Sequence, residues 1–140
     1  MDGHRADEPA ARPLVLIVEG HEDTCALYAL ALSTMGFDVI PTFDGTEGYR
    51  QAFENRPDII VTNLPMPDFD GWQFLRDLKL NPRTSRIPVV AVSAYVERSV
   101  RERAERDGFA AFFVKPCLPD HLAAGLRQVL DGNGHAHLEG

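Results

Sequence analysis

The chain has 140 residues and a net charge of −7, with 21 acidic residues against 14 Lys and Arg. This length favours one domain with a core of its own, and the acidic balance argues against a protein whose main task is to bind nucleic acid phosphates. No apolar run approaches the roughly 20 residues that cross a bilayer, and the polar N-terminus lacks the apolar region of a secretory signal. We therefore expect a cytoplasmic protein that binds neither nucleic acid nor membrane.

Five short apolar segments predict the strands of one sheet. They are residues 13–18, 38–43, 57–63, 87–94 and 109–115. The first, third and fourth are dense aliphatic runs, which are typical of central strands buried on both faces of a parallel sheet. The second contains Pro41, which favours a position near an edge or a strand end.

Five segments with helical character alternate with these strands. They are residues 22–36, 45–56, 71–81, 96–108 and 119–132. The spacing of apolar residues in the first helix predicts a buried stripe. Its members would be Leu27, Leu30, Ala31 and Met35. The fourth helix alternates Glu and Arg, which is typical of a solvated surface and equally compatible with a docking face.

The strict alternation of strands and helices predicts a doubly wound α/β fold with helices on both faces of a parallel sheet. With five strands and right-handed crossovers, we expect the flavodoxin-like order 2-1-3-4-5. The folded domain would span residues 13–131. Residues 1–12 are expected to be a disordered N-terminal segment and residues 132–140 a flexible tail.

Polar residues lie at or directly after the carboxyl ends of four predicted strands. They are Glu19, Asn63, Ser93 and Lys115. In sheets of this kind, ligands bind beyond the carboxyl ends of the strands, at the switch point between the first and third. An acid, an amide, a hydroxyl and an ammonium group should therefore converge on one crevice.

Four segments resemble the receiver domain of two-component response regulators, over about residues 13–131. They are VLIVEGHEDT, PDIIVTNLPMPDFDGWQFLRDLK, IPVVAVSAY and FFVKPC. Each is weakly specific alone, but the combination in this order and at these separations is specific. The resemblance implies a signal-transduction module of a phosphorelay rather than an enzyme.

The resemblance also implies a role for individual positions. These are Glu19 and Gly20 for the acid pair that helps to hold Mg²⁺, Asn63 for the phosphoacceptor, the Pro65 carbonyl for a backbone metal ligand, Ser93 and Phe112 for the switch, and Lys115 for the pocket lysine. Alternative interpretations stay open: Ser93 as an ordinary strand-end hydroxyl, and Phe112 as a core or half-buried aromatic residue.

Two positions depart from the family pattern. The amide of Asn63 has no carboxylate oxygen that could attack phosphorus. Gly20 removes a second carboxylate, although Mg²⁺ is usually bound through one or two carboxylates. Glu19 and Lys115 alone leave the pocket without net charge, so we expect weak or absent Mg²⁺ binding and no other cofactor.

Nearby acids offer alternatives to the missing ones. Glu22 and Asp23 could substitute as metal ligands, but acids in the first turn of a helix are also favoured by the helix dipole. Asp68 and Asp70 could serve as acceptors only if the pocket were rebuilt around them, and Asp70 also fits a turn or helix cap.

Three functions follow as hypotheses. The first is a pseudo-receiver, which is not phosphorylated on aspartate and binds a histidine kinase, a downstream signalling protein or a second copy through the fourth helix, fifth strand and fifth helix. The second is a working phosphorelay receiver with an engineered or atypical acceptor. The third is an unrelated flavodoxin-like enzyme or cofactor binder, which the acids of EGHEDT disfavour because they would repel a phosphate.

Overall fold

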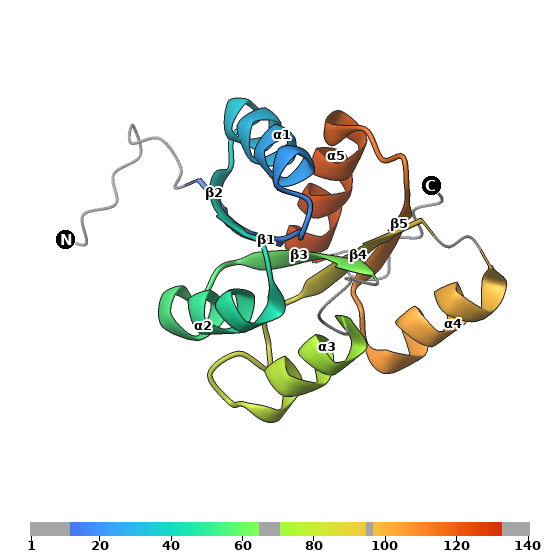
Figure 1. Ribbon diagram of the computed structural model, residues 1–140. Helices are drawn as coiled ribbons and strands as arrows, with labels where there is room; N and C mark the ends of the chain where they lie inside the picture. Colours follow the sequence, from blue (N-terminus) through green and yellow to red (C-terminus); the bar gives the residue numbers. More distant parts are fainter. Residues whose placement is uncertain (1–11, 65–70, 95–96, 133–140) are drawn as a thin grey trace.

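The sheet has five parallel strands in the order β2-β1-β3-β4-β5 (Figure 1). The computed structural model describes residues 12–64, 71–94 and 97–132. The strands are β1 (Leu14–Val18), β2 (Asp38–Thr42), β3 (Ile59–Leu64), β4 (Val89–Ser93) and β5 (Ala111–Val114). The predicted order is confirmed, and Pro41 lies in the edge strand β2 as its missing N–H requires.

Each strand is connected through a helix to the next strand along the chain. The helices are α1 (Glu22–Thr34), α2 (Gly45–Asn55), α3 (Gly71–Leu80), α4 (Arg98–Asp107) and α5 (Pro119–Leu130). All ten predicted elements form, and their ends differ from the prediction by at most two residues. The flavodoxin-like α/β architecture is therefore confirmed.

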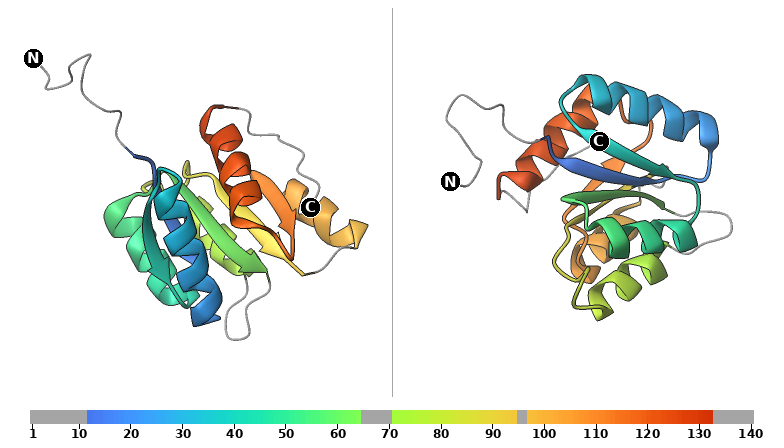
Figure 2. Two further views of the ribbon diagram at one scale, coloured as in Figure 1. Left: turned by 90° about the horizontal axis from the view of Figure 1, so that it is seen from above. Right: turned by 90° about the vertical axis from the view of Figure 1, so that its left-hand side faces the viewer.

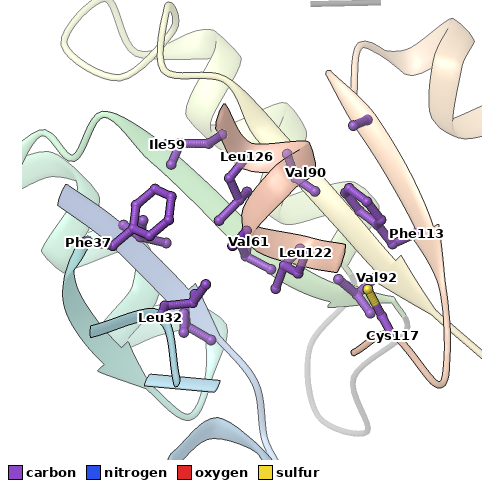
Figure 3. Packing of buried hydrophobic residues seen from close by; sticks show 14 of the residues in the cluster. Leu32, Phe37, Ile59, Val61, Val90, Val92, Phe113, Cys117, Leu122 and Leu126 are labelled. Atoms are coloured by element: carbon purple, nitrogen blue, oxygen red, sulfur yellow. The ribbon is translucent and has the colours of Figure 1, made fainter. Parts of the chain in front are cut away.

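Helices cover both faces of the sheet (Figures 1 and 2). α1 and α5 pack on one face, where Phe37, Val61 and Phe113 lie in the core with Leu122 and Leu126 of α5 (Figure 3). α2, α3 and α4 cover the other face. Since the central strands contact helices on both sides, their side chains are buried whichever way they point, which explains their continuous aliphatic runs.

The predicted buried stripe of α1 is wrong at two of its positions. Leu27 and Leu30 are 59 % and 67 % exposed. The helix instead buries Cys25 and Leu32, and Tyr28 packs beside them. Apolar residues occupy most of the circumference of α1, so their spacing alone does not identify the side that faces the sheet.

Contacts of the fold begin one residue before the predicted start of the domain. Arg12 donates a hydrogen bond of 3.0 Å to Asp38, and others to the carbonyl groups of Ser33 and Phe37. The remainder of the predicted disordered segment and almost all of the predicted tail lie outside the described residues. None of the described helices is both long and apolar enough to cross a membrane.

Candidate functional site at the carboxyl edge of the sheet

Strand register brings the predicted site residues to one edge of the sheet. Val18 at the end of β1 pairs with Thr62, so Glu19 and Asn63 both follow this pair. Ser93 pairs with Leu64, and the Lys115 amide donates a 2.7 Å hydrogen bond to the Ser93 carbonyl group. The four polar residues predicted from the sequence therefore come together at the carboxyl ends of β1, β3, β4 and β5.

Glu19 forms two interactions inside the protein. Its Oε1 lies 3.6 Å from Nζ of Lys115, and its Oε2 accepts a 2.9 Å hydrogen bond from the His21 amide. The side chain of Glu19 is 8 % exposed, against 31 % for Lys115. A carboxylate this deeply buried needs such partners because removing it from water is costly.

Asn63 and Ser93 occupy the middle of this edge. Asn63 is the penultimate residue of β3 and is half-buried, whereas Ser93 ends β4 and is fully buried. The predicted β3 ended at Asn63; the observed strand continues to Leu64, because the ladder with β4 reaches Ser93. An amide can donate and accept hydrogen bonds here but offers no carboxylate nucleophile.

Gly20 has room for a side chain. It is exposed, and a Cβ atom built on it would lie 3.5 Å from the carbonyl oxygen of Phe43, which is an ordinary contact distance. Gly71, at the start of α3, is different. A Cβ there would lie 2.2 Å from a methyl carbon of Leu64 and 3.2 Å from the Asn63 carbonyl oxygen. Packing against the Leu64 side chain therefore disfavours a side chain at position 71, whereas position 20 has room for one.

The described residues at this edge do not fit a Mg²⁺ ion, which would need several hard oxygen ligands. Across the described ranges, no three His, Cys, Asp or Glu side chains gather closely enough to hold a metal. Glu22 and Asp23 are exposed in the first turn of α1, where the helix dipole favours them. The predicted Pro65 ligand and the alternative acids Asp68 and Asp70 lie outside the described residues.

Phe112 lies within β5 rather than at its carboxyl end, and it packs on the face of the sheet that α4 covers. It pairs with Ala91, is half-buried, and packs against the core beneath α2, α3 and α4. The guanidinium of Arg101 in α4 lies 5.8 Å from the centre of its ring, within the range of a cation–π contact. Phe112 is thus a half-buried aromatic residue in contact with α4, and its role as a switch stays a prediction.

The sequence analysis did not predict the hydrogen bond that His21 makes to Glu19. Its amide binds Glu19, and its side chain caps α1 by accepting a 3.2 Å hydrogen bond from the Thr24 amide. One residue thus fixes both the start of α1 and the position of the acid. The short distance in sequence between the end of β1 and a run of helix-forming residues indicates a helix cap near His21, but not its hydrogen bond to Glu19.

Comparison with known proteins identifies the family. The family model for the response regulator receiver domain matches residues 15–127. The chain belongs to this family. The polar-differentiation response regulator DivK of Brucella anthropi is 32 % identical to it over 102 residues, which cover 73 % of this chain and 83 % of the relative.

Solved structures agree with this assignment. A response regulator from Desulfuromonas acetoxidans is 30 % identical, with a TM-score of 0.77 over 84 % of this chain and 96 % of that one. The chemotaxis response regulator CheY4 of Vibrio cholerae has a TM-score of 0.78 over 84 % of this chain and 98 % of that one. At 22 % identity, CheY4 supports the fold alone.

This receiver domain is a module of two-component signalling. Receiver domains are generally signalling modules rather than enzymes, and they interact with proteins such as kinases and effectors. The third hypothesis, an unrelated flavodoxin-like enzyme or cofactor binder, is therefore wrong. The family match leaves the first two hypotheses, which differ in the chemistry at Asn63.

Proposed function

We propose that this chain is a pseudo-receiver, a receiver module over residues 13–131 that is not phosphorylated on aspartate and acts by protein–protein interaction. Asn63 stands at the phosphoacceptor position and cannot form an acyl phosphate through its amide. Gly20 contributes no second acid to the pocket.

One observation carries the proposal: both oxygens of Glu19 have partners within the protein. Lys115 lies beside one oxygen and the His21 amide donates to the other. This arrangement balances the charge of the acid without a cation, so an approaching Mg²⁺ would have to compete with the ammonium of Lys115. The pair also holds Lys115 by its charge, which favours a single conformation of the site.

The interaction face that we propose consists of α4, β5 and α5. α4 buries only Ala104 among its residues, and arginine side chains make its aromatic contacts. Arg101 lies over Phe112, and Arg103 lies 4.0 Å from the centre of the Trp72 ring. A helix attached with so little aliphatic burial leaves most of its charged surface open to a histidine kinase, a downstream signalling protein or a second copy.

Intact-mass spectrometry after incubation with Mg²⁺ and a small phosphodonor tests the missing phosphorylation. The unmodified chain should gain no phosphoryl group. The Gly20→Asp/Asn63→Asp double variant is the positive control, because it restores both lost acids. Position 20 has room for the new side chain. A phosphoryl group on the unmodified chain would contradict the proposal.

The single variant Asn63→Asp separates the two remaining hypotheses. If the pocket is intact apart from its acceptor, this change alone should restore phosphorylation, as the second hypothesis requires. We expect it to restore little, because Gly20 still lacks a carboxylate for the metal. A Mg²⁺ titration followed by the fluorescence of Trp72 gives an independent measure: tight quenching in the unmodified chain would contradict weak metal binding.

A further inference from the structure

A groove between α2 and α3 lies away from the carboxyl edge and from the α4–β5–α5 face. Its volume is about 450 Å³. It is lined by Tyr49, Asp77, Leu80, Asn81 and Pro82. Figure 1 shows these two helices side by side, with the 81–88 loop below α2 and next to α3. Nothing in the chemistry at Asn63 uses this groove.

Two large apolar side chains near the groove are exposed to solvent instead of packing in the core. Leu80, the last residue of α3, is 81 % exposed, and Phe53 in the last turn of α2 is 40 % exposed. Tyr49 lies one turn before Phe53 and packs against the core from below the groove. Leu80 in the lining, and Phe53 one turn beyond Tyr49 on α2, therefore leave apolar surface that a ligand could cover.

The groove also has fixed polar groups. The Asn81 amide donates a 2.9 Å hydrogen bond to the hydroxyl of Tyr49, and the Asn81 side-chain oxygen accepts from the Arg83 amide at 2.9 Å. The Tyr49 hydroxyl thus accepts from Asn81 and can still donate its own proton to a ligand. This preorganisation joins the loop to α2 and reduces the ordering cost of binding there.

An arginine lies next to the groove lining in the sequence: Arg83 follows the lining residue Pro82. The guanidinium of Arg83 lies 5.1 Å from the centre of the Phe53 ring and donates to the Phe53 carbonyl group. Arg56, which follows α2, and Arg86, further along the loop, are both exposed. The one acid in the lining, Asp77, already accepts a hydrogen bond from Gln73.

This local charge is opposite to that of the whole chain. Residues 76–86 hold four basic residues and one acid, whereas the chain carries −7. One of the four, Lys79, lies toward Gly108 on the side of α4, whereas Arg83 contacts the lining residue Asn81 through its amide. Arginine and aromatic residues are both enriched in protein interfaces relative to the rest of the surface.

We propose that the α2–α3 groove is a docking site for an acidic peptide segment of a partner protein. A large apolar side chain of the peptide would lie between Leu80 and Phe53, and its carboxylates would lie beside Arg83. Charge complementarity selects the acidic partner. The inference is independent of the proposed function, because neither Asn63 nor Glu19 takes part in it.

The test uses nuclear magnetic resonance on the ¹⁵N-labelled chain. The probe is a seven-residue peptide with one central leucine and three glutamates on each side. Its addition should shift the amide signals of Tyr49, Leu80 and Asn81 in a saturable way, and raising the salt concentration should weaken the binding. Peptides with alanine at the centre, or with lysine in place of glutamate, should bind at least about tenfold more weakly.

Two variants and a matched control locate the site. Leu80→Ser should weaken peptide binding about tenfold or more, and Arg83→Glu should do the same through charge. Leu30→Ser removes a leucine of similar exposure from α1 and should leave the affinity unchanged. Because Leu80 is almost fully exposed, its variant should unfold at the temperature of the parent protein.

Several outcomes would overturn the inference. They are the absence of a saturable shift, equal binding of the alanine-centred peptide, shifts that map to α1 and respond to Leu30→Ser, and unchanged affinity in Leu80→Ser. A dimer seen by sedimentation that Leu80→Ser abolishes would assign the groove to a second copy instead. Loss of peptide binding would leave the phosphorylation result untouched, so the two proposals fail separately.

Discussion

Along β3, the residues from Ile59 to Thr62 are buried among helices on both faces, whereas Asn63, one position further, is half-buried at a polar edge. In the interior, a residue stabilises the fold through its volume and its lack of charge. At the edge, a residue contributes its functional group to the site, and the protein can fold with a different side chain at that position. A chain can therefore keep the receiver architecture with an amide at position 63 of this edge.

The largest expected effect belongs to the interior. Phe113→Ala removes a fully buried ring from the core between α5 and the sheet, and should lower the free energy of unfolding by about 3–5 kcal/mol. Urea denaturation measures this change. Leu30→Ala is the exposed counterpart and should stay within about 0.5 kcal/mol. Similar losses for the two variants would break the distinction between interior and surface.

The second largest expected effect is that of alkaline pH, which should lower the free energy of unfolding. Both cysteines are free and buried, and burial raises the pKa of Cys25 and of Cys117 from 9.0 to about 11, with a smaller contribution from the charge of Glu19 at Cys25. Between pH 9 and 11 the unfolded chain loses thiol protons that the folded protein keeps. Stability is therefore fully present below pH 9 and falls as the pH rises toward 11.

The size of this loss follows from roughly 1.4 kcal/mol per pKa unit, so we expect on the order of a few kcal/mol in total. Urea denaturation at a series of pH values measures it. The Cys25→Ala/Cys117→Ala variant should lose much of this slope. Burial also raises the pKa of Tyr28 from 10.0 to about 12, so a smaller slope should continue above pH 10. A flat profile from pH 9 to 11 would contradict the buried thiols.

Two glycines near the carboxyl edge of the sheet extend the comparison between packed and open positions. Gly71→Ala should cost about 1–3 kcal/mol, because its Cβ would collide with the buried side chain of Leu64. Gly20→Ala should leave stability within about 0.5 kcal/mol, because its Cβ has room. Thermal unfolding of both variants under identical conditions gives the difference. Equal stability would mean that position 71 is as permissive as position 20.

The smallest expected effect is that of the charge pair. Lys115→Met leaves the carboxylate of Glu19 without its cation and should cost about 1 kcal/mol, since Lys115 is partly exposed and the pair is 3.6 Å apart. Glu19→Gln in the same background should restore part of the loss. A double-mutant cycle from urea denaturation measures the coupling. A coupling energy of zero would mean that the Glu19–Lys115 pair does not stabilise the site.

Much of the site was predictable because strand ends in a parallel sheet share one edge. Glu19, Asn63, Ser93 and Lys115 follow aliphatic runs, and the runs alone predict where the chain leaves the sheet. The ion pair of Glu19 with Lys115 could be anticipated from opposite charges on the same edge. The hydrogen bond from the His21 amide could not, because it depends on the backbone path between β1 and α1.

The sequence by itself determined the ten elements, the strand order and the edge position of Pro41, because burial on both faces leaves a continuous aliphatic signal in each central strand. Only the tertiary structure decided which side of α1 faces the sheet. Its apolar residues surround the helix, and Leu27 and Leu30 are left exposed where Cys25 and Leu32 pack inward. The groove between α2 and α3 was equally hidden, because Phe53 and Arg83 lie 30 residues apart in sequence and meet only when the 81–88 loop packs against α2.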